Sequence, residues 1–244
     1  MMPSIVDVAG LNRVSRTIFA NAAGAICGMV ETAPPTSTED KPIIVASMFG
    51  NTTDCVKHAK SILEAEGYEV LVFHATGTGG RTMESLIETK IVAGVLDITT
   101  TEWADELVGG ILTAGPTRLE AAARNGIPAI ITPGCLDMVN FGARDNIPEK
   151  YADRTFYEHN PQVTLMRTTP GECAQLGSIL AEKVNLSTGQ VTVLLPLKGI
   201  SIISAEGQPS HDPSADTALF EAIKQNLRED IKLVELDYGV NNPK

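Results

Sequence analysis

The sequence predicts an α/β fold: an open, doubly wound, mostly parallel sheet of the Rossmann-like type, with helices on both faces. From residue 42 onward, short apolar runs alternate with amphipathic segments of helical period. The apolar runs are continuous rather than alternating, which is typical of strands covered on both faces. Of the 244 residues, 43% are hydrophobic and 20% charged, so the chain can bury a substantial core.

The first 41 residues are expected to form a separate part of the chain. Small and apolar side chains recur near a helical period at Leu11, Val14, Ser15, Ile18, Ala22, Ala25 and Ile26. Interrupting glycines and polar residues favour a packing helix over a signal peptide. Residues 32–41 are rich in Pro, Ser and Thr, which indicates a linker. We therefore expect a connecting helix over 1–31, a linker over 32–41 and an α/β domain over 42–244.

Within that domain, strands and helices are predicted in alternation. The apolar runs predict strands over 42–48, 68–74, 91–98, 129–132, 191–195 and 231–236. The amphipathic segments predict helices over 54–66, near 81–89, and over 102–108, 117–125, 172–183 and 215–227. The span 134–161 is expected to be rich in loops, and His211-Asp212-Pro213 is expected to cap the helix at 215–227.

Charge and cysteine usage exclude several classes of function. The chain carries 19 Lys and Arg against 30 Asp and Glu, a formal net charge of −11, without a basic run, which argues against a nucleic-acid partner. No apolar run is long enough to span a membrane. The four cysteines form no C-x-x-C pattern, so we expect no metal site, no disulfide framework and a reducing, cytoplasmic location.

The loops after the first four predicted strands are rich in Gly and Thr, and they are the candidate ligand site. Parallel strands bind ligands outside their carboxyl ends, and glycine turns leading into helices present backbone N–H groups to phosphate or carboxylate. Tight βα turns are the alternative interpretation, because neither a Walker loop nor G-x-G-x-x-G is present. The candidate cofactor-binding residues are Gly50, Asn51, Thr52, Thr53, Thr76, Gly77, Thr78, Gly79, Gly80, Arg81, Thr99, Thr100 and Gly134.

Titratable residues at the same strand ends are candidates for acid–base catalysis. These are His74, Asp97, Glu102 and Asp137. A structural role remains open for His74, and Glu102 can equally be a residue of a helix N-terminus. Cys135 follows a Pro-Gly turn without a paired histidine, so we expect an inert thiol.

Several long motifs resemble the UPF0261 family, the Tm-1-like ATP-binding proteins. They are residues 73–84 (FHATGTGGRTME), 96–102 (LDITTTE), 113–122 (TAGPTRLEAA), 133–142 (PGCLDMVNFG), 159–160 with 164–168, and 212–213 with 215–220. The match runs in order from about residue 5 to 237. The family's full module resembles two α/β subdomains in tandem, and the opening motif of the first is absent here. The chain therefore looks like the second subdomain preceded by its connecting helix.

The resemblance implies an ATP-binding module, with Mg²⁺ as a possible companion, whose glycine loops hold the phosphates. Two alternatives stay open: an enzyme acting on a small carboxylate or sugar acid at the same pocket, and a protein-interaction module. A homodimer is expected, because the small-residue face of the 11–30 helix needs covering. The absent first subdomain is the alternative partner.

Overall fold

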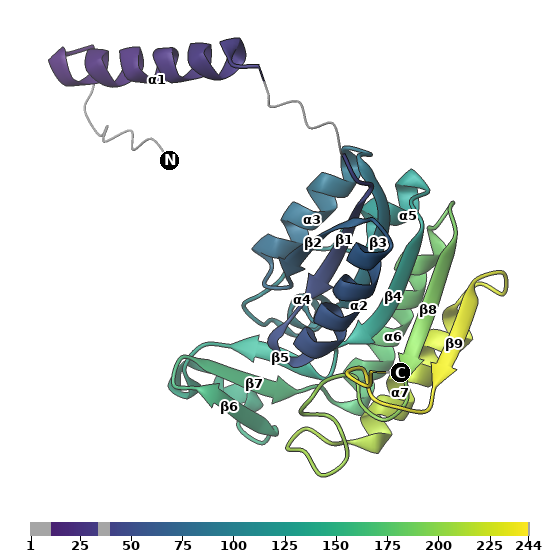
Figure 1. Ribbon diagram of the computed structural model, residues 1–244. Coiled ribbons are helices and arrows are strands. Elements are labelled where there is room, and N and C mark those ends of the chain that lie inside the picture. The colour runs from purple at the N-terminus through teal and green to yellow at the C-terminus, as the bar shows by residue number, and fades with distance from the viewer. Residues whose placement is uncertain (1–10, 34–39, 244) are drawn as a thin grey trace. The chain divides into compact units, whose positions relative to one another are not determined.

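A computed structural model describes residues 11–33 and 40–243 (Figure 1). The chain divides into two compact units, residues 1–40 and 41–244, which we describe separately. The first unit contains the predicted connecting helix as α1 (Arg13–Glu31), whose N-cap Asn12 accepts hydrogen bonds from the backbone N–H groups of Val14 and Ser15. Most of the predicted linker, residues 34–39, lies outside the described residues. No helix of the described residues is long and apolar enough to cross a bilayer.

The second unit is built on a parallel sheet of six strands, as the sequence predicts. In spatial order these are β2 (Glu69–His74), β1 (Ile43–Met48), β3 (Val92–Thr99), β4 (Ala129–Gly134), β8 (Val191–Pro196) and β9 (Lys232–Leu236). Because β2 and β3 lie on opposite sides of β1, the sheet changes winding direction at β1. That reversal makes the fold doubly wound and creates the switch point where such sheets bind ligands.

Helices cover the two faces of this sheet unequally. On one face only α2 (Thr53–Ala65) packs, against a cluster that includes Ala46, Val70 and Leu96. The other face carries the larger core and five helices (Figure 1): α3 (Thr78–Glu88), α4 (Glu102–Val108), α5 (Glu120–Asn125), α6 (Pro170–Asn185) and α7 (Pro213–Asn226). The front of β4, β8 and β9 in Figure 1 is left without a helix.

The structure adds a second sheet, two of whose three strands lie inside the span 134–161 that the sequence predicts as loop-rich. The strands β5 (Met138–Phe141), β7 (Val163–Arg167) and β6 (Phe156–Asn160) form an antiparallel sheet in that order. The described residues also form 3₁₀ turns at Gly50–Thr52, Arg144–Asn146 and Glu149–Tyr151. The small sheet is anchored by apolar contacts of Cys135, Met138, Leu165 and Ile203. β5 is only four residues long and β6 is largely exposed, so neither gives a clear apolar run.

Candidate functional site

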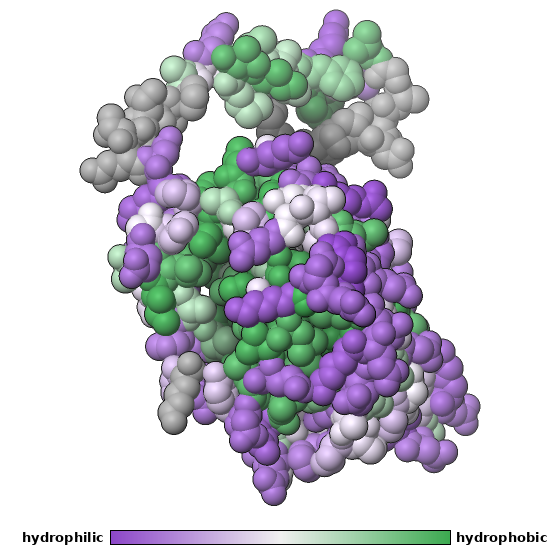
Figure 2. Space-filling model, turned by 90° about the vertical axis from the view of Figure 1, so that its right-hand side faces the viewer, coloured by the Kyte–Doolittle hydropathy of each residue, from purple (hydrophilic) through white to green (hydrophobic). Residues whose placement is uncertain are grey.

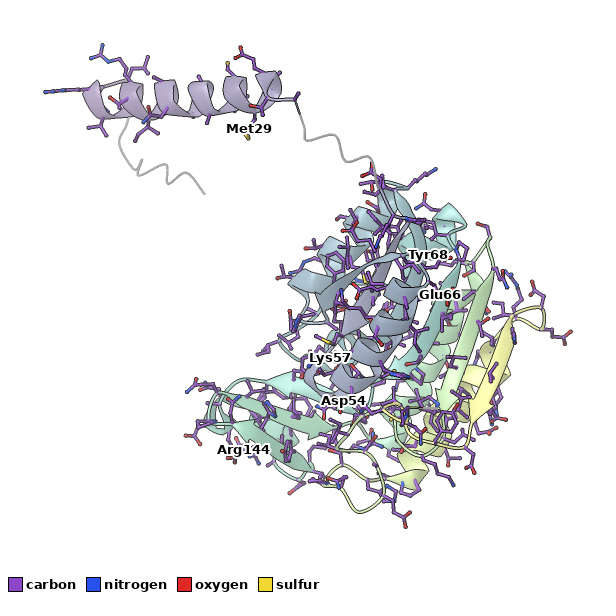
Figure 3. All side chains as sticks on the ribbon, viewed as in Figure 1. Met29, Asp54, Lys57, Glu66, Tyr68 and Arg144 are labelled. Carbon is purple, nitrogen blue, oxygen red and sulfur yellow. The ribbon has the colours of Figure 1, made fainter. Side chains whose placement is uncertain are left out.

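The predicted ligand loops come together at the carboxyl end of the sheet. Met48 and His74 are paired across β1 and β2, and Ser47 and Asp97 are paired across β1 and β3, so all three strands end at the same level. Their loops therefore surround the switch point at β1. Asp54, in the first turn of α2, lies at this end, whereas Glu66 and Tyr68 lie at the opposite one (Figure 3).

A side chain of the protein already accepts hydrogen bonds from the backbone N–H groups that the sequence predicts to bind phosphate. The backbone N–H groups of Gly77 and Gly80 donate to Oε1 of Glu102, with N–O distances of 2.7 and 3.1 Å. A Cβ on Gly80 would come within 2.4 Å of both Glu102 oxygens, so any side chain at this position would displace the Glu102 carboxylate. The two amides bind an anion of the protein itself, the Glu102 carboxylate.

The Glu102 carboxylate also forms an ion pair with Arg118, which pairs with two further carboxylates. Its guanidinium is completely buried and donates to Glu102 (2.7 Å), to both oxygens of Asp97 (2.6 Å each) and to Glu84 (3.0 Å). Burial alone would lower the pKa of Arg118, but the charges of Asp97, Glu102 and Glu84 raise it well above its ordinary value. Glu84 also accepts from the N–H groups of Leu119 and Ala121 at the start of α5.

Several other predicted cofactor-binding residues are buried and hydrogen-bonded within the protein. The hydroxyls of Thr52 and Thr99 lie 2.7 Å apart, and the Thr100 hydroxyl donates to the carbonyl of Thr132. The Asn51 amide donates to the sulfur of Met138. Gly134 packs so closely on Ile98 that a Cβ would lie 2.0 Å from its carbonyl oxygen. These groups hold the strand ends together and are not free to bind a ligand.

The accessible members of the predicted set surround the start of α3. Gly50, Thr76, Thr78 and Arg81 are exposed, and Thr53 and Gly79 are half-buried. The Arg81 guanidinium donates to the carbonyl of Thr113 (2.8 Å) and lies 3.4 Å from the Thr78 hydroxyl. Hydroxyl and guanidinium donors therefore face solvent beside the switch point.

The four candidate catalytic residues are not brought together. Asp97 and Glu102 share Arg118 and are buried, which leaves neither exposed to a substrate. Asp137 follows β4, is fully buried, and accepts a hydrogen bond from the Ser201 hydroxyl (2.8 Å). Burial raises the pKa of Asp137 to about 6, although Arg167 and Ser201 act in the opposite direction. His74 is exposed, and among the described residues no side-chain hydrogen bond or ion pair joins it to the three carboxylates.

The two buried thiols are poor nucleophiles. Burial, together with the charge of Asp137, raises the pKa of Cys135 well above its ordinary value. Burial also raises the pKa of Cys173 to about 11. Among the described residues, no group of three or more His, Cys, Asp and Glu side chains could hold a metal ion.

Sequence reasoning missed the residues that organise this end of the molecule. The sequence assigns no role to Arg118 or Glu84, although an arginine beside the alanine-rich run of residues 119–123 is a signal for a buried ion pair.

A second cluster, in which Arg167 contacts Asp216 at 2.6 Å, lies behind a cleft of about 470 Å³ near the ends of β8 and β9. The predicted cap is confirmed there, since Asp212 accepts from the N–H groups of Ser214 and Ala215.

Comparisons with known proteins agree with this architecture. Residues 41–244 match the model of the "Uncharacterised protein family (UPF0261) C-terminal domain", and residues 1–35 match the N-terminal domain of the same family. A UPF0261 protein of Clostridium tetani is 49% identical over 99% of this chain and 60% of its own length. The ToMV resistance protein Tm-1(GCR237) of Solanum lycopersicum is 43% identical over 99% of this chain and 33% of its own length.

The solved structures are much less similar. A thioesterase domain from the curacin biosynthetic pathway is 12% identical, with a TM-score of 0.37 over 84% of this chain and 87% of that one. The chain spans about three fifths of the length of the Clostridium relative that it matches.

Proposed function

Because this chain belongs to the UPF0261 family, we propose that its 41–244 unit is a nucleotide-binding module that takes ATP at the carboxyl ends of β1, β2 and β3. One observation carries the proposal: the exposed donors of two loops lie beside the switch point of a doubly wound sheet. Ligands of such sheets collect at that point, where loops of opposite winding diverge.

The phosphate side of the proposed site is the outer surface of the α3 N-terminus. The hydroxyls of Thr76 and Thr78 and the guanidinium of Arg81 supply donors there, and residues 50–53 at the start of α2 form the adjacent wall. The N–H groups of Gly77 and Gly80 already donate hydrogen bonds to Glu102. Their role is therefore to hold the loop in its conformation rather than to bind phosphate.

The buried charges behind this surface favour a divalent cation with the nucleotide. Three carboxylates, Glu84, Asp97 and Glu102, face one guanidinium, a formal surplus of two negative charges. The chain as a whole carries a net charge of −11. A bare triphosphate is repelled by both, and Mg²⁺ offsets part of that repulsion.

The geometry supports binding better than acid–base catalysis. A general acid or base must lie within hydrogen-bond reach of its substrate. Asp97, Glu102 and Asp137 are each at most 2% exposed and already hold protein partners. His74 is the accessible member of the four.

Calorimetric titration of the chain with ATP, with and without Mg²⁺, tests the proposal. We expect saturable binding with Mg²⁺ and a loss of affinity of about tenfold or more in Arg81→Ala, the usual effect of removing a charge-assisted hydrogen bond. Arg124→Ala is the matched control, because Arg124 is an exposed arginine at the end of α5. Equal affinity in the two variants would refute the assignment of the phosphate side.

Glycine substitutions do not provide a clean test of this site. A Cβ on Gly79 would lie 1.8 Å from the carbonyl oxygen of His74, and a Cβ on Gly80 would lie 2.3 Å from an oxygen of Glu102. Such variants would disturb the loop whether or not it binds a nucleotide.

A further inference from the structure

The cleft near the ends of β8 and β9 has the size and the mixed lining of a small-molecule site. We call it the α7 cleft, because α7 forms one wall of it and residues of the segment 197–211 form the opposite wall. Its volume of about 470 Å³ lies within the range of about 300–1,000 Å³ that is usual for ligand pockets. Leu197, Pro213 and Phe220 make its apolar surface. Figure 2 views the unit from the side that carries β9, where hydrophobic residues are bordered by hydrophilic ones.

The lysines of the α7 cleft already have partners in the protein, whereas its carboxylates are in excess. Lys224 forms ion pairs with Glu221 (3.1 Å) and Glu235 (2.5 Å), and Lys198 forms one with Asp237 (3.1 Å). The lining contains two lysines against four carboxylates, which are those of Glu206, Asp216, Glu221 and Glu235. The lining therefore has a formal surplus of two negative charges, which favours a cationic ligand.

Asp216 has one carboxylate oxygen to offer a ligand. Its Oδ1 accepts from the Arg167 guanidinium at 2.6 Å, and its Oδ2 accepts no hydrogen bond from the part of the chain that the structure describes. The side chain is 13% exposed and lines the α7 cleft. Burial raises the pKa of Asp216, although Arg167 acts in the opposite direction. A second cation at Oδ2 would therefore stabilise the carboxylate.

The buried groups behind Asp216 are also short of positive charge. Arg167 is 6% exposed and lies near two carboxylates, those of Asp216 and of the fully buried Asp137. Among the described residues, neither Nε of Arg167 nor Oδ1 of Asp137 has a hydrogen-bond partner. One guanidinium thus faces two carboxylates, so the protein leaves part of this negative charge uncompensated.

His211 adds a neutral acceptor to the α7 cleft. Its Nδ1 lies 3.2 Å from the carbonyl oxygen of Ser204. A carbonyl can only accept, so Nδ1 carries the hydrogen and Nε2 of the neutral ring is an acceptor. Glu206, on the segment opposite α7, is exposed, and its carboxylate has no hydrogen bond or ion pair with the described residues. The cleft therefore offers acceptors of three kinds to one ligand.

We propose that the α7 cleft binds a small primary amine. The ammonium group donates hydrogen bonds to the free oxygen of Asp216 and to Glu206 and His211, and the apolar part of the molecule packs on Leu197 and Phe220. An ammonium group has three N–H donors and no acceptor, which suits a lining with acceptors in excess. The site lies at β8 and β9, and β8 is three places from β1 in the sheet, so the proposal does not rest on ATP binding.

Titration of the ¹⁵N-labelled chain with pentylamine, followed by NMR, tests this site. Pentan-1-ol and pentanoate are the matched probes, because they keep the alkyl chain and replace the cation by a neutral or an anionic group. We expect saturable shifts of the Asp216 and Phe220 amides with pentylamine, with a Kd of about 1–10 mM for so small a ligand. The two other probes should bind about tenfold more weakly or not at all. Equal binding of all three, or no saturable shift with pentylamine at about 50 mM, would overturn the proposal.

Two exposed positions locate the binding without disturbing the buried cluster. Thr217→Trp places a large ring in the α7 cleft from an exposed position of α7 and should abolish the shifts. Glu206→Gln removes one acceptor charge and should weaken pentylamine binding about threefold to tenfold. Glu229→Gln is the matched control, because Glu229 is exposed and lies outside the cleft lining. Unchanged binding in Thr217→Trp, or equal affinities in the two glutamine variants, would show that the amine binds elsewhere.

Discussion

Arg118 is the residue on which the strand-end network most depends. Its guanidinium is 0% exposed and contacts three carboxylates from α3, β3 and α4. Removing one partner of a buried ion pair leaves uncompensated charge and costs about 3–5 kcal/mol. We expect Arg118→Met to lower the free energy of unfolding by about that amount in urea titrations.

Arg124→Met provides the reference for that experiment. Arg124 is 67% exposed and pairs with Glu120 one helical turn away, so we expect a change within about 0.5 kcal/mol. Equal losses in the two variants would mean that the buried carboxylates are stabilised without Arg118.

Asp137 gives the protein a stability term that depends on pH. Burial raises its pKa in the folded state to about 6, from an ordinary value of 3.8, and its Oδ1 has no hydrogen-bond partner among the described residues. The folded state therefore holds a proton that the unfolded chain releases above about pH 4. This contribution is present at low pH and is lost as the pH rises through about 6.

The comparison of wild type with Asp137→Asn isolates this term, because asparagine does not titrate. Between pH 5 and 7.5 we expect the stability of the wild type to fall by about 1.4 kcal/mol relative to the variant. Urea titrations at the two pH values measure it. A constant difference between the two proteins, or one of opposite sign, would show that Asp137 titrates normally.

At the scale of elements, the contact between α6 and α7 depends on one glycine. A Cβ on Gly177 would lie 2.5 Å from the carbonyl oxygen of Leu219 and 2.8 Å from the Cβ of Ala222. Both contacts are with the backbone or a short side chain, so one helix must shift. We expect Gly177→Ala to destabilise the unit by about 1–3 kcal/mol, the usual cost of overpacking.

Gly171 in the same helix is a matched control. A Cβ there meets nothing within 4 Å, and alanine favours helices over glycine by up to about 1 kcal/mol. Gly171→Ala should therefore be neutral or stabilising in thermal unfolding. A stabilised Gly177→Ala would contradict the close helix packing.

The elements that could be predicted from sequence are those with local signals. The sequence predicts α4 with its observed bounds, because a hydroxylated segment precedes it and Gly109 ends it. The helix α3 begins at Thr78, before the predicted start near Arg81, since its first turn contains the glycines assigned to a loop. The helix α5 begins after the predicted Thr117, because Leu119 adopts a positive φ of 77° just before it.

The site was harder to predict, because its key contacts are not local. The glycine-rich loop can be identified from sequence, but not that its N–H groups donate to the carboxylate of Glu102, 22 residues after Gly80. Likewise β5 pairs with β7 some 25 residues later, and the four residues of β5 are too few to give a clear strand signal. Composition reveals that a loop suits an anion, whereas only the tertiary fold reveals which anion is there.

At the scale of the whole molecule, the core of the 41–244 unit is formed without α1. Among the described residues, its three apolar clusters contain none before Ile43. We therefore expect a chain lacking residues 1–40 to fold, and to unfold at the same temperature as the full chain when both are dilute.

Calorimetric scans of the full and the shortened chain measure this. Each apolar cluster of the 41–244 unit is complete without the first unit, so the shortened chain should unfold in one cooperative transition. A shortened chain that fails to fold, or that melts at a clearly lower temperature, would contradict the prediction.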